Sequence, residues 1–500
     1  MLKTHDIIVN ELIKSVQRQA YNPYKPLSPA DIDLIHETTM DVFSEIGFKV
    51  HLPEIFEMLR KMGASVDSHE RVVRIGESIV MELISSIPSE LTLYARKAKH
   101  NVHLGTGNVY FGTGGTALNV LDYETDQQRA ANLLDLVEIV RLVDHLDNIH
   151  LLLIPTYPND LSIEKVDINR FFTGLANTEK HIMGGVYTSQ GIRDVIAMAE
   201  IVAGSAEALR EKPFISMITC GISPLVFDSK YGALMIQVAK ENIPLAVPVE
   251  PLCGATAPIT LAGNLVIQNC DALIHLMTTQ MVNPGAPVLY GCVATSTDLR
   301  DLNYLGGPVE SGMINAATAQ LAQHYGIPYY ATAGISDSKI LDVQSGYESA
   351  VNNLLVALAG ADFIHDAAGL MEFAMTVSKE KLVIDNEILG MVQRAVQGIE
   401  VNKDTLALDV IRQAGPGGNF TTLRHTRKYM RKEHYFPKLS DREKRQVWEQ
   451  NGKKTTKERA HEEVERILSE PHCSYIPTDV IKTLINRFPD IKSVAYNSNP

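Results

Sequence analysis

The 500-residue sequence has few cysteines, no long apolar run and a shortage of positive charge. The five cysteines are scattered without any CxxC pair, which argues against a disulfide framework. The formal net charge of −13 argues against nucleic acid, because phosphate binding needs a basic surface, and against anionic membranes. No segment approaches the roughly 20 apolar residues of a membrane span, and the start, MLKTHDIIVNELIKS, lacks the apolar core of a signal peptide. We therefore expect a cytoplasmic protein.

Phosphate-binding loops are missing as well. The glycine runs GTGG (112–115) and GPGG (415–418) lack the GK[ST] ending of a P-loop. No GxGxxG motif follows the first apolar, strand-like segment of the central region (108–115), which disfavours an open doubly wound sheet that binds dinucleotides.

The middle of the chain instead repeats one pattern. Apolar, β-branched bursts end in glycine, proline or small residues, and each is followed by a segment long enough for a helix, such as 133–147 or 192–205. Near-continuous apolar strands that alternate with amphipathic helices are typical of a parallel sheet covered by helices. Eight such units predict a closed (β/α)8 TIM barrel, with an open doubly wound sheet as the alternative. The eight bursts are 108–115, 149–157, 181–188, 214–221, 243–250, 286–294, 327–334 and 361–369.

The flanking regions differ from this pattern in composition. Residues 1–105 combine short helical and alternating segments and are interpreted as an N-terminal α+β cap, and 106–413 as the barrel. Residues 414–500 are polar and rich in charge, which predicts a C-terminal helical extension packed on the barrel with solvated outer faces. The alternative is a docking surface for a partner.

Polar residues gather after the last two bursts, at the edge where TIM barrels carry their active sites. Asp337 and Lys339 follow one burst, and His365 and Asp366 belong to the end of the other. The first pair is expected to be a surface ion pair. The GTGG run is expected to let loops approach closely at this mouth.

Four segments resemble the trimethylamine:corrinoid methyltransferase family, and in particular its members without pyrrolysine. They are FGTGGTALNVLDYETDQQR (111–129), RLVDHLDNIH (141–150), GISDSKILDVQSGYE (334–348) and the tail GPGGNF…RHTRKYMRKE…FPKLSDREKRQVWEQNG (415–452). The resemblance implies a TIM-barrel enzyme that passes a methyl group from an amine to the Co(I) corrinoid of a separate carrier protein. It implies no tightly bound cofactor, because the corrinoid belongs to the partner. Archaeal members that use trimethylamine carry pyrrolysine in the barrel, and this sequence contains only standard residues. A quaternary amine is therefore expected: glycine betaine first, otherwise proline betaine or carnitine.

A quaternary ammonium is bound by aromatic faces and is balanced by a carboxylate. Several residues at predicted strand ends suit this task, and the protein's part in catalysis is then only positioning. Each also has an ordinary structural interpretation, as a packing ring, a hydrogen-bonded histidine or a carboxylate on a loop amide. The candidates are His365, Phe373, Tyr330, Phe363, Glu250, Tyr187 and Tyr347, with Tyr157 and Tyr290 at two further strand ends.

Three other functions remain open at this point. Cys220, Cys253 and Cys292 follow three successive strands and could bind Zn²⁺, which would suit a corrinoid methyltransferase for thiols or alcohols. A cytoplasmic quaternary-amine sensor could use the same aromatic pocket without catalysis. A Schiff-base lyase would need a lysine at a strand end, and Lys339 lies too far along its loop. We also expect a homo-oligomer, as large cytoplasmic barrels commonly are.

Overall fold

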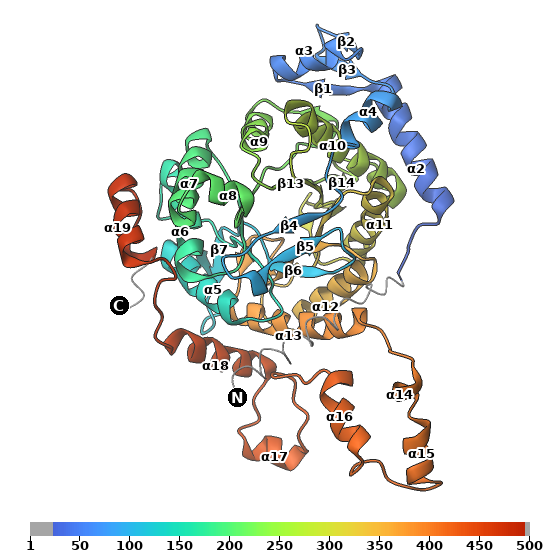
Figure 1. Ribbon diagram of the computed structural model, residues 1–500, viewed down its shortest axis with the longest axis vertical. Helices are drawn as coiled ribbons and strands as arrows, with labels where there is room; N and C mark the ends of the chain where they lie inside the picture. Colours follow the sequence, from blue (N-terminus) through green and yellow to red (C-terminus); the bar gives the residue numbers. More distant parts are fainter. Residues whose placement is uncertain (1–23, 496–500) are drawn as a thin grey trace.

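A computed structural model describes residues 24–495, and its centre is a closed parallel barrel (Figure 1). The strands lie in the order β6-β19-β18-β15-β13-β11-β10-β9, and a parallel bridge between Gly112 and Leu151 joins the two ends. All eight predicted bursts contain one of these strands, so the predicted TIM barrel is confirmed. The strands are β6 (Tyr110–Thr113), β9 (Leu152–Leu153), β10 (Ile182–Gly185), β11 (Ile215–Ile218), β13 (Leu245–Val249), β15 (Val288–Cys292), β18 (Tyr329–Thr332) and β19 (Phe363–Ala368).

Helices between successive strands surround this barrel. Most of them begin at a residue whose side chain accepts a hydrogen bond from the first turn, such as Asn132 before α5, Thr260 before α10 and Asp342 before α12. None of the helices in residues 24–495 is long and apolar enough to cross a membrane. The surrounding helices are α5 (Leu133–His145), α6 (Ile163–Asn177), α7 (Ser189–Ala203), α8 (Ala206–Glu211), α9 (Lys230–Lys240), α10 (Leu261–Val282), α11 (Val309–Tyr325), α12 (Val343–Leu358) and α13 (Lys379–Val396).

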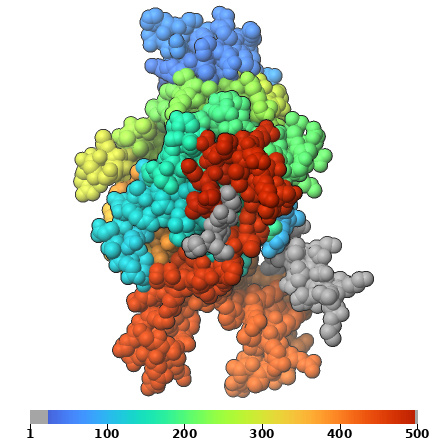
Figure 2. Space-filling model, turned by 90° about the vertical axis from the view of Figure 1, so that its left-hand side faces the viewer, coloured from blue at the N-terminus to red at the C-terminus, as the bar shows by residue number. Residues whose placement is uncertain are grey.

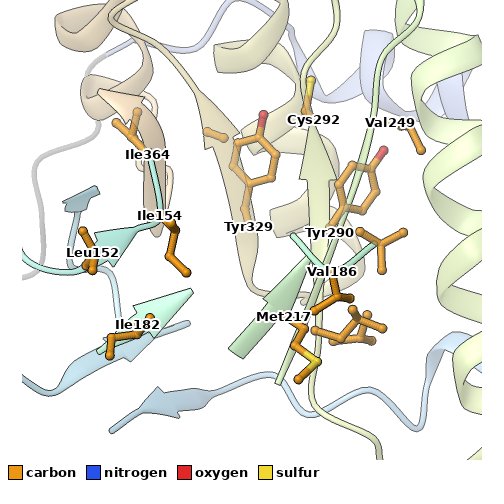
Figure 3. Close-up of a cluster of buried hydrophobic side chains, with 14 of the residues drawn as sticks. Leu152, Ile154, Ile182, Val186, Met217, Val249, Tyr290, Cys292, Tyr329 and Ile364 are labelled. Carbon is orange, nitrogen blue, oxygen red and sulfur yellow. The ribbon is translucent and has the colours of Figure 1, made fainter. Parts of the chain in front are cut away.

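Alternate residues of each strand face the helices and the barrel interior. Tyr329 points outward and its hydroxyl donates to the Asn315 carbonyl on α11 (3.0 Å). Tyr290 also points outward, where its hydroxyl donates to Asn269 Oδ1 on α10 (3.0 Å) (Figure 3). Tyr330, one residue after Tyr329, belongs to the separate apolar cluster inside the barrel. Tyr290 is therefore a packing residue, and its candidacy for the site was wrong.

A hairpin closes the amino-terminal end of the barrel. It consists of β4 (Leu91–Leu93) and β5 (Val102–Leu104), and it lies across the barrel in Figure 1. Its residues Leu93, Val102 and Leu104 are at most 1% exposed and belong to the same cluster as Phe363. The Asp362 carboxylate fixes the hairpin to the barrel, because it accepts the N–H groups of Gly105 (2.7 Å) and Tyr329 (2.8 Å).

Two small sheets lie on the loops at the other end. One has the order β14-β16-β17 and the other the order β20-β21-β7-β8. They give the long loops after β13, β15, β19 and β6 a fixed shape around the mouth. Their strands are β7 (Asn119–Leu121), β8 (Gln128–Ala130), β14 (Leu252–Cys253), β16 (Thr295–Thr297), β17 (Tyr304–Leu305), β20 (Leu370–Met371) and β21 (Thr376–Val377).

The region before the barrel forms a small sheet with helices. Its strand β1 pairs in parallel with β12 (Val226–Phe227), in the loop after β11, which attaches this region to the barrel. The predicted boundary at residue 105 stays a prediction, and residues 1–23 of the predicted cap lie outside the described residues. The elements are α2 (Pro29–Asp41), the π-helix η1 (Val42–Ile46), β1 (Phe48–Val50), α3 (Pro53–Lys61), β2 (Ser65–Asp67), β3 (Val72–Arg74), α4 (Glu77–Ile84) and the 3-10 helix η2 (Ala98–His100).

The carboxyl-terminal region consists of helices with two different environments. Helix α18 packs on α13 and α5 through the buried side chains of Ala460, Val464 and Ile467. Helices α14 to α17 extend away from the barrel (Figures 1 and 2). The predicted boundary at 413 stays a prediction. The helices are α14 (Lys403–Leu406), α15 (Leu408–Ala414), α16 (Arg424–Glu433), α17 (Arg445–Gln450), α18 (Thr456–Ser469), α19 (Thr478–Arg487) and η3 (Ser493–Ala495).

Candidate active site at the barrel mouth

A cavity of about 480 Å³ opens at the carboxyl end of the strands, within the range of small-molecule sites. Five of the predicted candidates line it: His365, Phe373, Tyr330, Glu250 and Tyr187. The other lining residues are Gly115, Thr116, Leu153, Gly185, Val186, Ile218, Thr219, Cys220, Tyr231, Pro248, Val293, Tyr304, Asp366, Ala374 and Met375.

The floor of the cavity contains two stacked rings. Tyr330 on β18 and His365 on β19 have ring centroids 4.1 Å apart and an interplanar angle of 21°. In the adjacent parallel strands Tyr330 pairs with Phe363, and Thr332 pairs with His365. Tyr330 and His365 are therefore diagonal neighbours two residues apart in the register, which allows their rings to stack. Both residues are at least 95% buried, so the Tyr330 ring is held in one orientation.

Hydrogen bonds fix the imidazole of His365 from both sides. Its Nδ1 lies 2.6 Å from the Ala331 carbonyl oxygen, and its Nε2 lies 2.9 Å from Oδ2 of Asp366. The Thr332 hydroxyl lies 3.2 Å from each ring nitrogen as well, so both nitrogens of His365 have partners within the protein. Asp366 has a φ of 57°, and its Oδ1 accepts the Gly115 N–H (2.9 Å). The histidine and aspartate are thus engaged with the protein and with each other.

The GTGG run makes this arrangement possible. A Cβ on Gly114 would lie 2.2 Å from Cδ1 of Leu370 and 3.0 Å from Oδ1 of Asp366. A side chain at this position would therefore displace the loop that carries the carboxylate. The expected close approach of loops at the mouth is confirmed.

Glu250 follows β13 directly and its side chain lines the cavity. Within residues 24–495, its carboxylate has no hydrogen-bond or ion-pair partner, and its surface is exposed to the cavity. Desolvation at the mouth raises the pKa of Glu250 to about 7, and the nearby negative charge of Asp366 adds to this effect. The carboxylate can therefore gain or lose a proton near neutral pH.

Phe373 reaches the cavity on a strained turn between β20 and β21. Glu372, Phe373 and Ala374 have φ angles of 48°, 60° and 65°, three consecutive left-handed residues without a glycine. This conformation costs roughly 1–2 kcal/mol per residue. Lys339 lies over the Phe373 ring, with its Nζ 4.3 Å from the centroid. The fold therefore maintains an unfavourable turn whose result is an aromatic ring at the mouth.

The Lys339–Asp337 ion pair was predicted wrongly. Lys339 Nζ donates to the backbone carbonyl of Asp337 (2.8 Å). The Asp337 carboxylate instead accepts the N–H groups of Gly306 and Gly307 (2.9 and 3.1 Å). Asp337 thus stabilises the loop that follows β17.

Tyr187, after β10, lines another wall of the cavity, and Tyr157 and Arg170 support its ring. The two tyrosine rings meet edge to face, with centroids 5.4 Å apart, and the Arg170 guanidinium lies 5.4 Å from the Tyr187 centroid. Arg170 is fully buried and donates to the carbonyls of Thr156, Ile154 and Gly185. Tyr157 itself does not line the cavity and acts only as support.

Two predicted candidates do not reach the cavity. Phe363 faces the barrel interior, as His365 does, but lies one layer deeper and is fully buried with its ring 5.5 Å from that of Tyr330. Tyr347 is 55% exposed on α12, outside the barrel. Both predictions were wrong about position. For Phe363, strand alternation shows that the side chain faces the interior of the barrel but not how far it lies below the rim. For Tyr347, the helix that follows the strand turns the side chain outward.

Sequence reasoning missed Tyr304, Tyr231 and Met375. Tyr304 belongs to β17, within the long loop after β15, and Tyr231 lies on α9. Burial raises the pKa of Tyr304 well above its ordinary value, and Glu250 and Asp366 add to the shift. None of the predicted strands ends at these residues, so the strand pattern of the sequence contains no signal for them, and only an aromatic residue in a long loop could have suggested Tyr304.

The three cysteines of the zinc hypothesis do not converge. Cys220 lines the cavity, Cys292 lies 3.7 Å from Thr318 Oγ1 on α11, and Cys253 is buried on β14. Residues 24–495 contain no group of three His, Cys, Asp or Glu side chains that could hold a metal ion. The alternative of a zinc site formed by these three cysteines is therefore not supported by residues 24–495.

Comparison with known proteins identifies the family of this chain. The family model described as trimethylamine methyltransferase (MTTB) matches residues 4–489. A trimethylamine methyltransferase of Desulfitobacterium hafniense is 35% identical over 91% of this chain and 92% of its own length. A glycine betaine methyltransferase of the same species is 32% identical, with 91% and 93% covered. The monomethylamine methyltransferase structure from Methanosarcina barkeri is 11% identical, with a TM-score of 0.42 over 88% of this chain and 92% of that one. The chain belongs to the trimethylamine methyltransferase (MTTB) family.

Proposed function

We propose that this protein transfers a methyl group from a quaternary amine to the Co(I) corrinoid of a separate carrier protein. The observation that carries the proposal is the cavity itself, where aromatic rings and the unpaired carboxylate of Glu250 surround one open space at the barrel mouth. Glycine betaine, proline betaine and carnitine are the donors that the family resemblance suggests. The relative from Desulfitobacterium hafniense that acts on glycine betaine supports a quaternary donor.

The proposed reaction is a displacement at carbon. Co(I) attacks one N-methyl group, the carbon–nitrogen bond breaks, and its electron pair stays on nitrogen as a neutral tertiary amine leaves. The nitrogen of the substrate is already positively charged, so the step requires neither a proton nor a Lewis acid. What the chain has to supply is orientation and the exclusion of water.

The rings at the mouth are suited to hold the ammonium group. Cation–π contacts contribute about 0.5–2 kcal/mol each, so several rings are needed for useful binding. Tyr330 on the floor, Tyr187 on one wall and Phe373 on the strained turn approach the cavity from different elements. The fixed His365–Asp366 pair keeps the floor ring in place, and Glu250 balances the positive charge.

Anaerobic methyl transfer tests the proposal. The full-length protein is incubated with cob(I)alamin as the corrinoid probe and with a panel of quaternary amines, and the loss of Co(I) absorbance is followed. At least one amine should be demethylated with one equivalent of methylated corrinoid formed. Binding of amines without any methylation would favour the sensor instead, and would overturn the proposal.

A further inference from the structure

The charges around the cavity are unbalanced. Its lining includes the carboxylates of Glu250 and Asp366, and no lysine or arginine from residues 24–495 is among the lining residues. Asp366 is engaged by His365 and by the Gly115 N–H. The site therefore presents one unpaired negative group, Glu250, to whatever enters.

Three basic side chains contact lining residues without lining the cavity themselves. Arg170 donates to backbone carbonyls and to the hydroxyls of Tyr187 and Thr116. Lys339 donates to the Asp337 carbonyl, and Lys230 lies over the Tyr231 ring with its Nζ 5.0 Å from the centroid. His365 has an acceptor at each ring nitrogen. A carboxylate on the substrate would thus meet Glu250 without a lysine or arginine among the lining residues to compensate for the repulsion.

We infer that the donor accepted here is a quaternary ammonium ion without a carboxylate, and that Glu250 selects this monocation over zwitterionic betaines. The inference rests on the proposed function and refines it, since the betaines that the resemblance favours become the poorer substrates. Aromatic faces would bind the ammonium group of either kind, so discrimination between them falls to Glu250.

The protonation of Glu250 gives the inference a pH signature. Around pH 7 the carboxylate loses its proton, so affinity for a monocation should rise between pH 6 and pH 8. Affinity for a betaine should fall over the same range, because protonated Glu250 can donate to a carboxylate whereas the ionised form repels it. Desolvation at the mouth raises the pKa of Cys220 to about 12 and the pKa values of Tyr304 and Tyr330 well above their ordinary range, so these three groups stay neutral between pH 6 and pH 8. The titratable groups that face Glu250 across the cavity are Cys220 after β11, Tyr187 after β10, Tyr231 on α9, Tyr304 on β17, Tyr330 on β18, and His365 and Asp366 on β19.

Choline and glycine betaine make a matched pair of probes, because they are similar in size and differ by one unit of charge. Isothermal titration calorimetry of the full-length protein at pH 8 should show choline binding at least tenfold more tightly. Glu250→Gln should weaken choline binding at least tenfold, leave glycine betaine unchanged or tighter, and remove the pH dependence. Glu241→Gln is the control, because Glu241 is an exposed carboxylate just before the other end of β13 and should change neither affinity.

Tighter binding of glycine betaine by the native protein, or a choline preference that survives Glu250→Gln, would overturn the inference. The equilibrium assay does not depend on methyl transfer. A choline preference together with an inactive methylation assay would therefore contradict the proposed function while leaving the selectivity of the cavity intact.

Discussion

The two ends of the barrel are built from the same eight strands but have opposite surfaces. At the amino-terminal end, the β4–β5 hairpin covers the strands with leucine and valine side chains that are at most 1% exposed. At the carboxyl-terminal end, small sheets hold the loops apart around a cavity of about 480 Å³ lined by rings and carboxylates. The amino-terminal end contributes buried apolar side chains to the stability of the fold, and the carboxyl-terminal end carries the candidate site. Equivalent substitutions should therefore lower stability at the first end and activity at the second.

The largest expected effect is at the closed end. Leu104→Asp would bury a carboxylate in an apolar cluster and should destabilise the fold by several kcal/mol, seen as a large fall in Tm or as insoluble protein. Met375→Asp, at an exposed position of the mouth, should leave Tm nearly unchanged in a thermal denaturation experiment. Similar losses of stability in both variants would contradict the distinction between the two ends.

An intermediate effect is expected for the rings of the open end. His365→Ala and Phe373→Ala should each lower kcat/KM for the accepted amine by tenfold or more, equivalent to about 1.4 kcal/mol. His365→Ala removes the ring that stacks on Tyr330, and Phe373→Ala removes a wall of the cavity. Steady-state methyl transfer measures both, with Tyr347→Ala as a control on exposed α12. Unchanged kinetics in both variants would exclude these residues from the site.

A smaller effect should separate strain from binding at Phe373. Glycine is ordinarily about 0.5–1 kcal/mol less stable than alanine within regular structure. At a φ of 60° this order should reverse, so Phe373→Gly should have a higher Tm than Phe373→Ala while both bind the amine weakly. A lower Tm for the glycine variant would mean that the left-handed turn is not under strain.

The smallest expected effect concerns stability and pH, because the Glu250 side chain is exposed to the cavity and solvent screens its charge. The pKa of Glu250 is raised to about 7, so the folded state holds a proton that the unfolded chain releases near pH 4.5, and stability is lost as pH rises between these values. Glu250→Gln removes this loss. Its Tm should therefore exceed that of the native protein at pH 8 and equal it at pH 4, measured without amine and beside Glu241→Gln. A constant difference across this pH range would exclude Glu250 as the cause.

The barrel could be predicted because each buried parallel strand is almost continuously apolar and ends where small residues begin. The same signal located Tyr330 and His365, since both belong to strands whose ends are visible in the sequence. It did not reveal Tyr304, which a hairpin within a long loop brings to the mouth. It also failed for Phe363, because the distance of a residue from the rim depends on strand length and register rather than on alternation.

The hairpin over the amino-terminal end also restricts traffic. Leu93, Val102 and Leu104 seal that end, so under the proposed function the amine and the corrinoid carrier would share the opening at the carboxyl end of the strands. The amine would then have to enter first, and the spent amine could depart only after the carrier withdraws. The proposed function would therefore require ordered kinetics, in which excess carrier slows turnover by covering this opening before the amine has entered.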